Sequence, residues 1–440
     1  MSAIAEILLT QGYRISGSDR AKSSITETLE KMGACVFEGQ NAKNLPKDTD
    51  ILVYSSAVSM DNPEIVEAAK RKIPIVRRAE MLAEVMRLKY GIGIAGTHGK
   101  TTTTSMTSLA LIEGGLDPTV IVGGNLSGIG GTNARLGEGD FIVVEADEYD
   151  RTFLALNPTV AVLTNMEADH LDCYEDLNDI RDCFIQYANK VPFYGFIVLC
   201  LDEPNLRSIL PNLKKNKIIT YGIEKGADLR ATHIEHRKDV SLFVVEQKEK
   251  KLGSIVLQTP GNHNVRNALA AIAVGLELEI PFSKLKRGIE DFAGVKRRWE
   301  RKGKTNGILV YDDYAHHPTE CAASISGAKS GWDNRIVCVF QPHLFSRTRD
   351  FYKEFAKSLS LADVAIVVDV YPAREKPIVG VTSEMITDEM KRIGHKNAHY
   401  IPNKEDIPHF LQEVTKPDDL VITMGAGDIW KYGEIFLTLK

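Results

Sequence analysis

Cysteine is scarce in this sequence, and so are long apolar runs. The six cysteines among 440 residues are scattered and form no C-x-x-C pair. This spacing excludes a disulfide framework and a cysteine zinc site, and it indicates a reducing compartment. The longest apolar run, residues 268–276, is far shorter than the roughly 20 residues of a membrane-spanning helix. Because no basic-then-apolar leader is recognisable either, we expect a cytoplasmic protein that does not contact membranes.

Excess positive charge is also lacking. The 54 lysines and arginines face 59 acidic residues, a net charge of −5, and no stripe of basic and aromatic residues occurs. We therefore expect no nucleic-acid partner. With 43% apolar and 26% charged residues, the composition excludes a disordered or fibrous chain. A length of 440 residues exceeds one hydrophobic core and predicts about two to four domains.

Short β-branched runs alternate with helical patterns from end to end. The predicted strands are 50–54, 92–95, 141–145, 160–164, 195–199, 308–312, 336–340, 365–370 and 419–424. Near-continuously apolar strands separated by helices are typical of parallel sheets buried on both faces. Residues 241–258 alternate with period two instead, which predicts a hairpin appended to the middle of the chain.

Two places interrupt the alternation and mark candidate domain boundaries. Near residues 87–90 a predicted helix ends and a Gly-rich strand begins. Residues 294–301 form a basic stretch before the next strand, for which a solvated linker is an equal interpretation. The sequence therefore predicts an α/β protein of three domains, at 1–88, 89–297 and 298–440.

The strongest local signal is a glycine-rich turn followed by Lys-Thr. Residues 92–103 read Ile-Gly-Ile-Ala-Gly-Thr-His-Gly-Lys-Thr-Thr-Thr, an apolar strand that enters a helical run. Backbone N–H groups of such a turn and a helix N-terminus form an anion site for di- and triphosphates. Lys100 would reach the β- and γ-phosphates, and the Thr101 hydroxyl would hold Mg²⁺. Because Ile94 occupies the first glycine position of the strict P-loop pattern, the sequence predicts a variant loop.

Acidic and histidine residues follow two of the predicted strands. The segments are Phe-Ile-Val-Val-Glu-Ala-Asp-Glu at 141–148 and Leu-Thr-Asn-Met-Glu-Ala-Asp-His at 163–170. Open α/β sheets bind ligands at the carboxyl ends of their strands. Glu145 and His170 are therefore candidate metal ligands beside the phosphates. Mg²⁺ prefers oxygen, so the histidine indicates a second or softer site for Mg²⁺ or Mn²⁺.

Three more polar segments are candidates for substrate contacts. Residues 261–268 begin an Ala-rich helix, where helix capping and nucleobase recognition by the asparagines are equal interpretations. Residues 312–319 contain an Asp-Asp pair and a His-His pair at a strand end, and 340–350 contain His343 and Arg347. An arginine at such a place clamps phosphate or carboxylate. We assign the histidines to substrate positioning rather than to metal binding.

Taken together, these motifs resemble the Mur ligase family over essentially the whole chain. They are Gly96-Thr-His-Gly-Lys-Thr-Thr, Glu145-Ala-Asp-Glu, Asn165-Met-Glu-Ala-Asp-His, Gly261-Asn-His-Asn-Val-Arg-Asn-Ala, Asp312-Asp-Tyr-Ala-His-His-Pro-Thr, Phe340-Gln-Pro-His, Tyr371-Pro-Ala-Arg-Glu-Lys-Pro-Ile and Met424-Gly-Ala-Gly-Asp-Ile. The resemblance implies an ATP-dependent ligase of peptidoglycan precursor synthesis, of the branch that adds L-alanine to UDP-N-acetylmuramate. In that reaction ATP phosphorylates the lactyl carboxylate, and the amino group of L-alanine then displaces phosphate from the acyl phosphate.

The resemblance also implies a fold and a set of site residues. The three domains would be a Rossmann-like UDP-binding domain, a central P-loop ATPase domain with a mostly parallel sheet and a C-terminal Rossmann-like domain. The implied catalytic residues are Lys100, His316, His343 and Arg347. The implied ATP contacts are Gly96, Thr97, His98, Gly99, Lys100, Thr101, Thr102, His263, Asn267, Arg298 and Asp313. The implied Mg²⁺ ligands are Thr101 and Glu145 for one ion and His170 for a second. The implied substrate contacts are Ser18, Asp19, Ser55 and Ser56 for the UDP part and Tyr371, Arg374 and Glu375 for the amino acid.

Two departures from the family pattern bear on the branch and on the first domain. Many Mur ligases carry a carbamylated lysine after the Asp-His motif, whereas residues 171–189 contain no lysine; the alanine-adding branch shares this absence. Similar proteins begin with a strand and a Gly-x-Gly-Gly-x-Gly-Met loop, of which only residues 1–5 stand here. We therefore expect a truncated first domain that lacks its first strand.

Several alternatives remain open on the sequence. A ligase that recycles murein tripeptide shares the ATP motifs, although Gln341-Pro-His with Arg347 and Tyr371-Pro-Ala-Arg-Glu favour the alanine-adding branch. A non-catalytic ATP-binding protein is the alternative from another class. A nucleic-acid-dependent ATPase is the weakest, because the net charge is negative. We expect small-molecule substrates and a monomer or weak homodimer.

Overall fold

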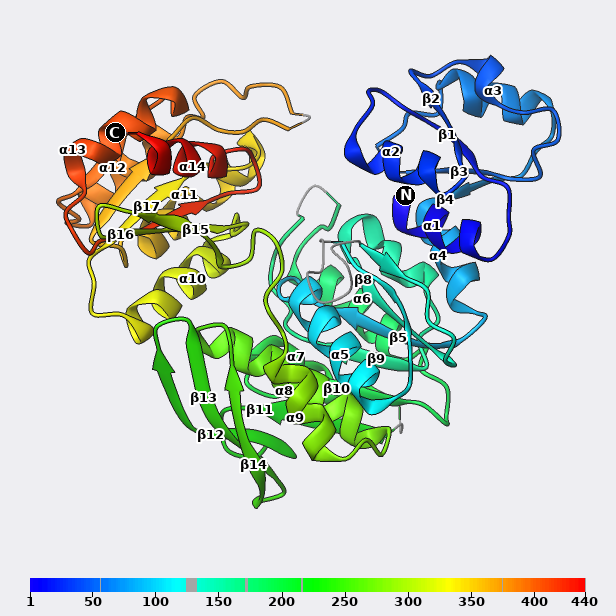
Figure 1. Ribbon diagram of the computed structural model, residues 1–440, viewed down its shortest axis with the longest axis horizontal. Helices are drawn as coiled ribbons and strands as arrows, with labels where there is room; N and C mark the ends of the chain where they lie inside the picture. The colour runs from blue at the N-terminus through cyan, green and yellow to red at the C-terminus, as the bar shows by residue number, and fades with distance from the viewer. Residues whose placement is uncertain (56, 124–132, 171–172, 215–216, 374, 440) are drawn as a thin grey trace. The chain divides into compact units, whose positions relative to one another are not determined.

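The computed structural model describes residues 1–55, 57–123, 133–170, 173–214, 217–373 and 375–439 (Figure 1). They form two compact units. The first unit comprises Met1–Thr232, Val245–Gly253 and Arg266–Phe292, and the second comprises His233–Val244, Ser254–Val265 and Ala293–Lys440. Among the described residues, no helix combines the length and the apolar character that crossing a bilayer requires.

The first 86 residues contain short elements in two small parallel sheets. The elements are α1 (Ser2–Thr10), β1 (Ser16–Asp19), α2 (Ser24–Lys31), β2 (Cys35–Glu38), η1 (Ala42–Asn44), β3 (Leu52–Tyr54), α3 (Pro63–Lys70), β4 (Ile75–Arg77) and α4 (Arg78–Met86). Strand β1 pairs with β2, and β3 pairs with β4. Strand β1 is polar and was not among the predicted strands; it is held by pairing of residues 16–19 with residues 35–38.

The next part of the chain is built on a mostly parallel sheet that carries the glycine-rich loop, and it belongs to the first unit except for residues 233–244 and 254–265. Its elements are β5 (Tyr90–Ala95), α5 (Lys100–Gly114), β6 (Thr119–Ile121), β7 (Ala134–Arg135), β8 (Phe141–Ala146), η3 (Tyr149–Ala155), β9 (Val160–Leu163), α6 (Leu177–Ala188), β10 (Phe196–Cys200), α7 (Pro204–Ile209), η4 (Leu210–Asn212), β11 (Lys217–Gly222), β12 (Leu229–Arg237), β13 (Val240–Gln247), β14 (Lys250–Leu257), α8 (Asn262–Glu277) and α9 (Phe282–Glu290). The strand order is β14-β13-β12-β11-β10-β9-β5-β8-β6-β7. Strand β5 is central and pairs in parallel with β8 and β9, so the ends of three buried strands meet beside the loop.

The predicted hairpin at 241–258 is part of a longer three-strand segment, β12 to β14. Strand β12 also alternates in burial with period two, and the prediction missed it. The tip of this segment, residues 233–244, belongs to the second unit, whereas the sequence predicted a hairpin appended to the middle of the chain. There Asp239 accepts hydrogen bonds from Trp299 Nε1 (3.1 Å) and from the Tyr311 hydroxyl (2.8 Å), which ties the tip to the C-terminal sheet.

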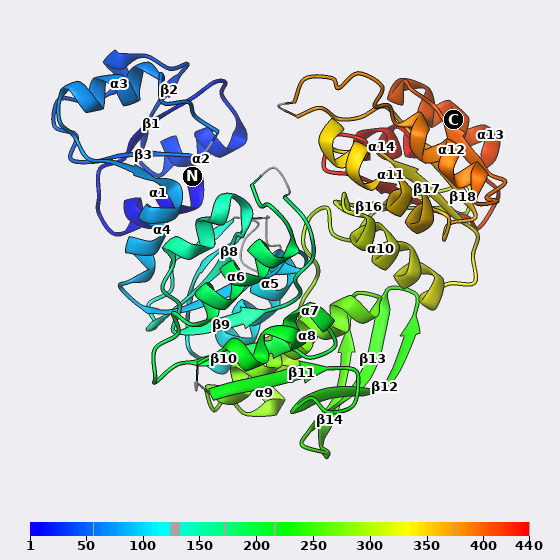
Figure 2. The same cartoon turned by 180° about the vertical axis from the view of Figure 1, so that it is seen from behind.

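The second unit contains a six-stranded sheet with helices on both faces (Figure 2). Its elements are β15 (Glu300–Thr305), β16 (Ile308–Asp313), α10 (Pro318–Gly331), β17 (Ile336–Phe340), α11 (Phe345–Leu359), β18 (Val364–Val367), α12 (Glu384–Arg392), β19 (Ala398–Tyr400), η5 (Lys404–Asp406), α13 (Ile407–Val414), β20 (Leu420–Met424) and α14 (Trp430–Thr438). The order is β15-β16-β20-β17-β18-β19, parallel except for the β15–β16 pair.

Two apolar clusters hold this second sheet between its helices. One joins α10, α11 and α12 to the sheet through Ile325, Phe355 and Met390. The other joins α13 and α14 through Leu411 and Phe436. Because these strands are buried on both faces, their sequences read as continuous apolar runs. Strand β17 was predicted at 336–340, with its observed bounds.

Candidate active site

The loop Gly96–Gly99 joins β5 to α5 and needs glycine at both ends. Gly99 has φ 78° and precedes the first turn of α5, a left-handed conformation that glycine adopts without strain. A Cβ on Gly99 would lie 2.8 Å from Asn267 Oδ1, and a Cβ on Gly96 would lie 2.0 Å from Thr164 Oγ1. Glycine at both positions therefore lets the loop pack closely against Thr164 and Asn267. The loop leads directly into the N-terminus of α5, which is the arrangement that binds phosphate.

The segment after β9 fixes the loop from the other side. Asn165 accepts a hydrogen bond from His98 N (2.8 Å) and donates one to His98 O (2.9 Å). Thr97 Oγ1 accepts from Glu167 N (2.9 Å), and the Thr164 hydroxyl donates to His98 O (2.8 Å). The sequence indicated only a ligand role for 163–170, whereas the structure also shows this clamp on the loop.

Lys100 and His170 both lie against a buried carboxylate that sequence reasoning did not single out. Glu148 Oε2 lies 2.7 Å from Lys100 Nζ, and its Oε1 lies 3.4 Å from His170 Nε2. Lys100 also donates to Gly96 O (2.8 Å). Burial by itself would lower the pKa of Lys100, but Glu148 and Asp147 beside it more than offset this and raise it. Lys100 is therefore a fully charged ammonium at the phosphate loop.

Thr101 and Glu145 form a pair of oxygen donors at the same place. Glu145 stands at the end of β8, where its Oε1 accepts a hydrogen bond from Gly123 N (2.8 Å). Burial raises the pKa of Glu145, although hydrogen bonds from Gly123 and Thr101 act in the opposite direction. A buried carboxylate with a raised pKa is stabilised by a nearby cation, and oxygen donors suit Mg²⁺. The donor set of Thr101 and Glu145 thus fits a hard divalent ion.

Asn267 and His263 lie one helical turn apart on α8. Asn267 is buried, and its Oδ1 accepts a hydrogen bond from the Thr103 hydroxyl (3.1 Å) beside Gly99. His263 packs against Gly261, where a Cβ would lie 2.7 Å from its Cε1. Asn267 is therefore close to the phosphate loop, whereas the observed neighbour of His263 is the turn that opens α8.

The second unit gathers another group of charged residues at the end of β16. Arg298 Nη1 lies 3.3 Å from Glu320 Oε1, and its guanidinium lies 5.2 Å from the centre of the Tyr314 ring. Asp313 accepts hydrogen bonds from Ala315 N and from the Ser324 hydroxyl, each 3.0 Å. Burial raises the pKa of Asp313 to about 6, although Arg298 opposes the shift.

His316 and His343 lie next to one another in this unit. Their ring centres are 5.7 Å apart and nearly perpendicular. His316 Nδ1 lies 2.9 Å from Tyr314 O and 3.2 Å from Glu320 Oε2. Burial lowers the pKa of His316 to about 3, so the imidazole is neutral at physiological pH. Arg347, buried on α11, is among the charges that act on this ring.

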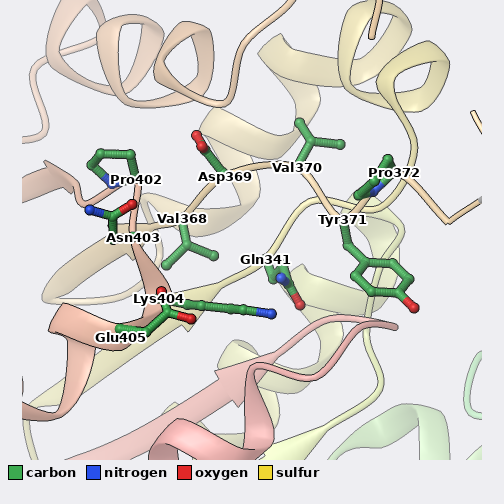
Figure 3. A pocket seen from close by; sticks show the side chains of 10 residues that line it. All are labelled: Gln341, Val368, Asp369, Val370, Tyr371, Pro372, Pro402, Asn403, Lys404 and Glu405. Carbon is green, nitrogen blue, oxygen red and sulfur yellow. The ribbon is translucent and has the colours of Figure 1, made fainter. Parts of the chain in front are cut away.

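Tyr371 connects this group to a cavity of about 170 Å³ (Figure 3). Its ring stacks on His343 with ring centres 6.0 Å apart, and it lines the cavity together with Gln341 and Lys404. Glu375 accepts hydrogen bonds from Ser346 N (3.0 Å) and from the Ser346 hydroxyl (2.5 Å), which ties residues 371–375 to the start of α11.

The residues expected to hold the UDP part lie at the ends of β1 and β3. The Ser18 hydroxyl donates to Glu64 Oε2 (2.9 Å), and Asp19 Oδ1 accepts from Arg20 N (2.6 Å). Ser55 directly follows β3. Ser56 and Arg374 lie outside the described residues.

Apart from Ser18, Asp19 and Ser55 at β1 and β3, most of the predicted site residues form one group in each unit. In the first unit the loop, Lys100, Thr101, Glu145, His170 and Asn267 come together. In the second unit Arg298, Asp313, His316, His343 and Arg347 come together. The carboxylates that join members of each group, Glu148 and Glu320, were missed as site residues. The available signal for Glu320 was its place in the segment His-Pro-Thr-Glu, because an acid at the third position of a helix typically caps it.

Comparison with protein families matches all three parts of the chain. Residues 1–90 match the "Mur ligase family, catalytic domain", residues 94–275 the "Mur ligase middle domain", and residues 297–427 the "Mur ligase, glutamate ligase domain".

Individual relatives agree over the full length. The UDP-N-acetylmuramate–L-alanine ligase of Geotalea uraniireducens is 53% identical over 434 residues, which covers 99% of this chain and 94% of the relative. The enzyme of the same name from Salinibacter ruber is 51% identical and covers 100% and 92%. Among solved structures, UDP-N-acetylmuramate-alanine ligase from Thermotoga maritima matches with TM-score 0.81 and 30% identity over 99% of this chain and 95% of that one. A murein peptide ligase from Psychrobacter arcticus matches with TM-score 0.71 and 26% identity over 100% and 96%.

Proposed function

The chain belongs to the Mur ligase family, and on this basis we propose that it joins L-alanine to the carboxylate of UDP-N-acetylmuramate in an ATP-dependent reaction of peptidoglycan precursor synthesis. The observation that carries the proposal is identity above 50% with alanine-adding relatives over 99–100% of the chain. By contrast, the murein peptide ligase structure is only 26% identical.

We propose that the first unit activates the carboxylate. A carboxylate oxygen of the nucleotide-sugar attacks the γ-phosphorus of ATP, the bond to ADP breaks, and an acyl phosphate forms. Such a transfer needs positioning and neutralisation of negative charge. The glycine-rich loop and the N-terminus of α5 supply N–H donors, and Lys100 supplies a charged ammonium. Asn267, held beside Gly99, is the proposed adenine-side contact.

We propose that Thr101 and Glu145 hold one Mg²⁺, and that His170 holds a second ion, Mg²⁺ or Mn²⁺. A bound divalent ion would neutralise phosphate charge. Glu145 is suited to this role because it is a buried carboxylate whose raised pKa reflects a poorly compensated charge. His170 is held through Nε2 by Glu148, so Glu148 orients the histidine and pairs with Lys100 at once.

We propose that the second unit completes amide formation. The amino group of L-alanine attacks the acyl carbon, the bond to phosphate breaks, and a proton leaves the nitrogen. Arg347, buried next to His316, is a candidate clamp for the acyl phosphate. His316 is neutral and is the candidate acceptor of that proton. Burial, which lowers its pKa to about 3, makes it a weak base in the free protein, and the negative charge of a bound acyl phosphate would raise that pKa. His343 and Tyr371, stacked between His316 and the cavity, are the proposed contacts of the incoming amino acid.

We further propose three functional domains, at 1–88, 89–297 and 298–440, in a cytoplasmic protein that acts on small molecules. The three family matches, at 1–90, 94–275 and 297–427, support this division. Ser18 and Asp19 are the last residues of β1 and Ser55 follows β3, where open α/β sheets present ligand contacts, and they are the proposed contacts of the UDP part.

Release of ADP and phosphate tests the proposal. The chain is incubated with ATP, Mg²⁺, UDP-N-acetylmuramate and L-alanine, and each component is omitted in turn. We expect equal amounts of ADP, phosphate and UDP-N-acetylmuramoyl-L-alanine, with no phosphate when either acceptor is absent. Turnover with free murein tripeptide but none with L-alanine would contradict the proposal and favour tripeptide recycling. ATP binding without any turnover would favour a non-catalytic protein.

A further inference from the structure

Glu320 lies in the first turn of α10 and caps that helix. Its Oε2 accepts hydrogen bonds from His316 N (3.0 Å) and His317 N (3.3 Å), which completes a capping box. An acid at this position stabilises a helix by itself, through the unpaired N–H groups and the helix dipole. Capping alone would therefore account for an acid here, and only contacts beyond the cap point to a further role.

Two such contacts exist, and they join the two halves of the proposed chemistry. Glu320 Oε1 lies 3.3 Å from Arg298 Nη1, and Oε2 lies 3.2 Å from His316 Nδ1. Arg298 is the arginine proposed to contact ATP, and His316 is the base proposed to serve the amine. The carboxylate that connects them has a side chain only 9% exposed, so solvent screens these contacts little.

The same geometry determines which ring nitrogen of His316 carries the proton. Nδ1 faces Tyr314 O at 2.9 Å and the Glu320 carboxylate at 3.2 Å, and both of these groups only accept hydrogen bonds. We therefore assign the proton to Nδ1, which leaves Nε2 as the acceptor of the neutral ring. The other charged groups that act on this ring are Arg298 and Arg347.

We propose that Glu320 is a positioning residue for ligation: it holds Arg298 and His316 in one arrangement and keeps His316 in the Nδ1–H form, so that Nε2 accepts the proton of the attacking amine. The proposal rests on the proposed function. Glu320 acts through its two partners and not on the reacting atoms. Its charge matters as well as its shape, because a neutral amide in its place would pair less strongly with Arg298 and could donate to Nδ1.

The tautomer is measured directly by two-bond ¹H–¹⁵N correlation spectra of the protein with ¹⁵N-labelled histidine. The His316 signals are assigned by their loss in H316Q. We expect the Nδ1–H form in the wild type and a substantial Nε2–H population in E320Q. An unchanged Nδ1–H form in both E320Q and E320A would overturn the proposal. The spectra need no substrate, so they test the geometry even if the wild type proves inactive, a result that would count against the proposed function alone.

Kinetics provide the second readout, with a matched control. Glu80 occupies the same capping position on α4, where it accepts a hydrogen bond from Arg77 N (2.6 Å). We expect E320Q to lower kcat/KM for L-alanine about 10²-fold, the low end for loss of a positioned base, and E80Q to change it less than twofold. The double variant E320Q/R298K should raise KM for ATP by a factor smaller than the product of the factors measured for the two single variants, because both changes remove the same contact. Equal effects of E320Q and E80Q, or independent effects of E320Q and R298K, would contradict the proposal.

Discussion

Replacing Glu148 by glutamine tests the electrostatic arrangement around the phosphate loop. The side chain is only 3% exposed and touches Lys100 Nζ at 2.7 Å and His170 Nε2 at 3.4 Å. Burial by itself would raise the pKa of Glu148, but Lys100 and His170 more than offset this, so its pKa lies below the ordinary value. Ionised Glu148 therefore stabilises the folded state, and E148Q removes this contribution while it keeps the shape of the side chain.

The loss of folding stability in E148Q depends on the partners that Lys100 keeps. Breaking a buried ion pair costs about 3–5 kcal/mol when the remaining charge has no other partner. Here Lys100 keeps its hydrogen bonds to Gly96 O and Thr97 O and has Asp147 at 4.0 Å. The loss should therefore be closer to that of one charge-assisted hydrogen bond, about 2 kcal/mol. For the first unit, which is larger than 250 residues, that corresponds to a fall in Tm of roughly 4 °C.

The assay is thermal unfolding of E148Q and of the wild type between neutral and acidic pH. A group with a depressed pKa stabilises the fold above its unfolded pKa and loses that effect as the pH falls through the folded value. The difference in Tm should thus be full at pH 7 and disappear when Glu148 becomes protonated. The control is D48N, which removes an exposed ion pair with Arg14 and should leave Tm unchanged. Equal Tm values at pH 7, or a difference that persists in acid, would refute this reasoning.

Three further predictions address the two groups of site residues. K100A should lower turnover by at least about 10³-fold with an unchanged far-UV circular dichroism spectrum, because the ammonium is used on phosphate; near-normal turnover would remove the phosphate-loop assignment. G99A should abolish the rise in Tm that ATP and Mg²⁺ produce, since φ is 78° and the new Cβ would meet Asn267 Oδ1 at 2.8 Å, and an undiminished rise would show that the loop tolerates the methyl group. The pKa of Asp313 is about 6 in the folded state, whereas an unfolded aspartate has a pKa of about 3.9. The free energy of unfolding of the wild type should therefore fall by roughly 3 kcal/mol as the pH rises from about 4 through 6. D313N should lose this pH dependence in urea unfolding while losing turnover, and parallel stability curves would contradict the assignment.

Much of the fold could be predicted from the sequence because its strands are buried on both faces. Residues 336–340 and 141–145 read as near-continuously apolar runs, and the structure places them in β17 and β8 of the two sheets. Residues 17–19 could not be predicted as a strand, since Ser16–Asp19 is polar and is held by pairing with β2 alone. Strand β12 was missed although its burial alternates, because the exposed positions of its second half are His233, Glu235 and Arg237 and the strand contains few apolar residues.

The site shows the same division between local and non-local information. The loop 96–99 could be predicted, because glycine, lysine and threonine at a strand-to-helix junction are adjacent in sequence. Which acid pairs with Lys100 could not, since Glu145, Asp147 and Glu148 are near neighbours in sequence. The choice depends on the chain after β8, where Asp150 and Arg151 adopt positive φ values in η3. The contact of Glu320 with Arg298 likewise depends on how β16 and α10 meet.

Transfer of oxygen from the carboxylate to phosphate tests the central claim most directly. UDP-N-acetylmuramate labelled with ¹⁸O in its carboxylate is converted with ATP, Mg²⁺ and L-alanine, and the released phosphate is analysed by mass spectrometry. The acyl-phosphate route predicts one ¹⁸O atom in each phosphate, because the attacking carboxylate oxygen leaves with phosphorus when the amine attacks. Phosphate released without ¹⁸O, or without formation of the L-alanyl product, would contradict the account.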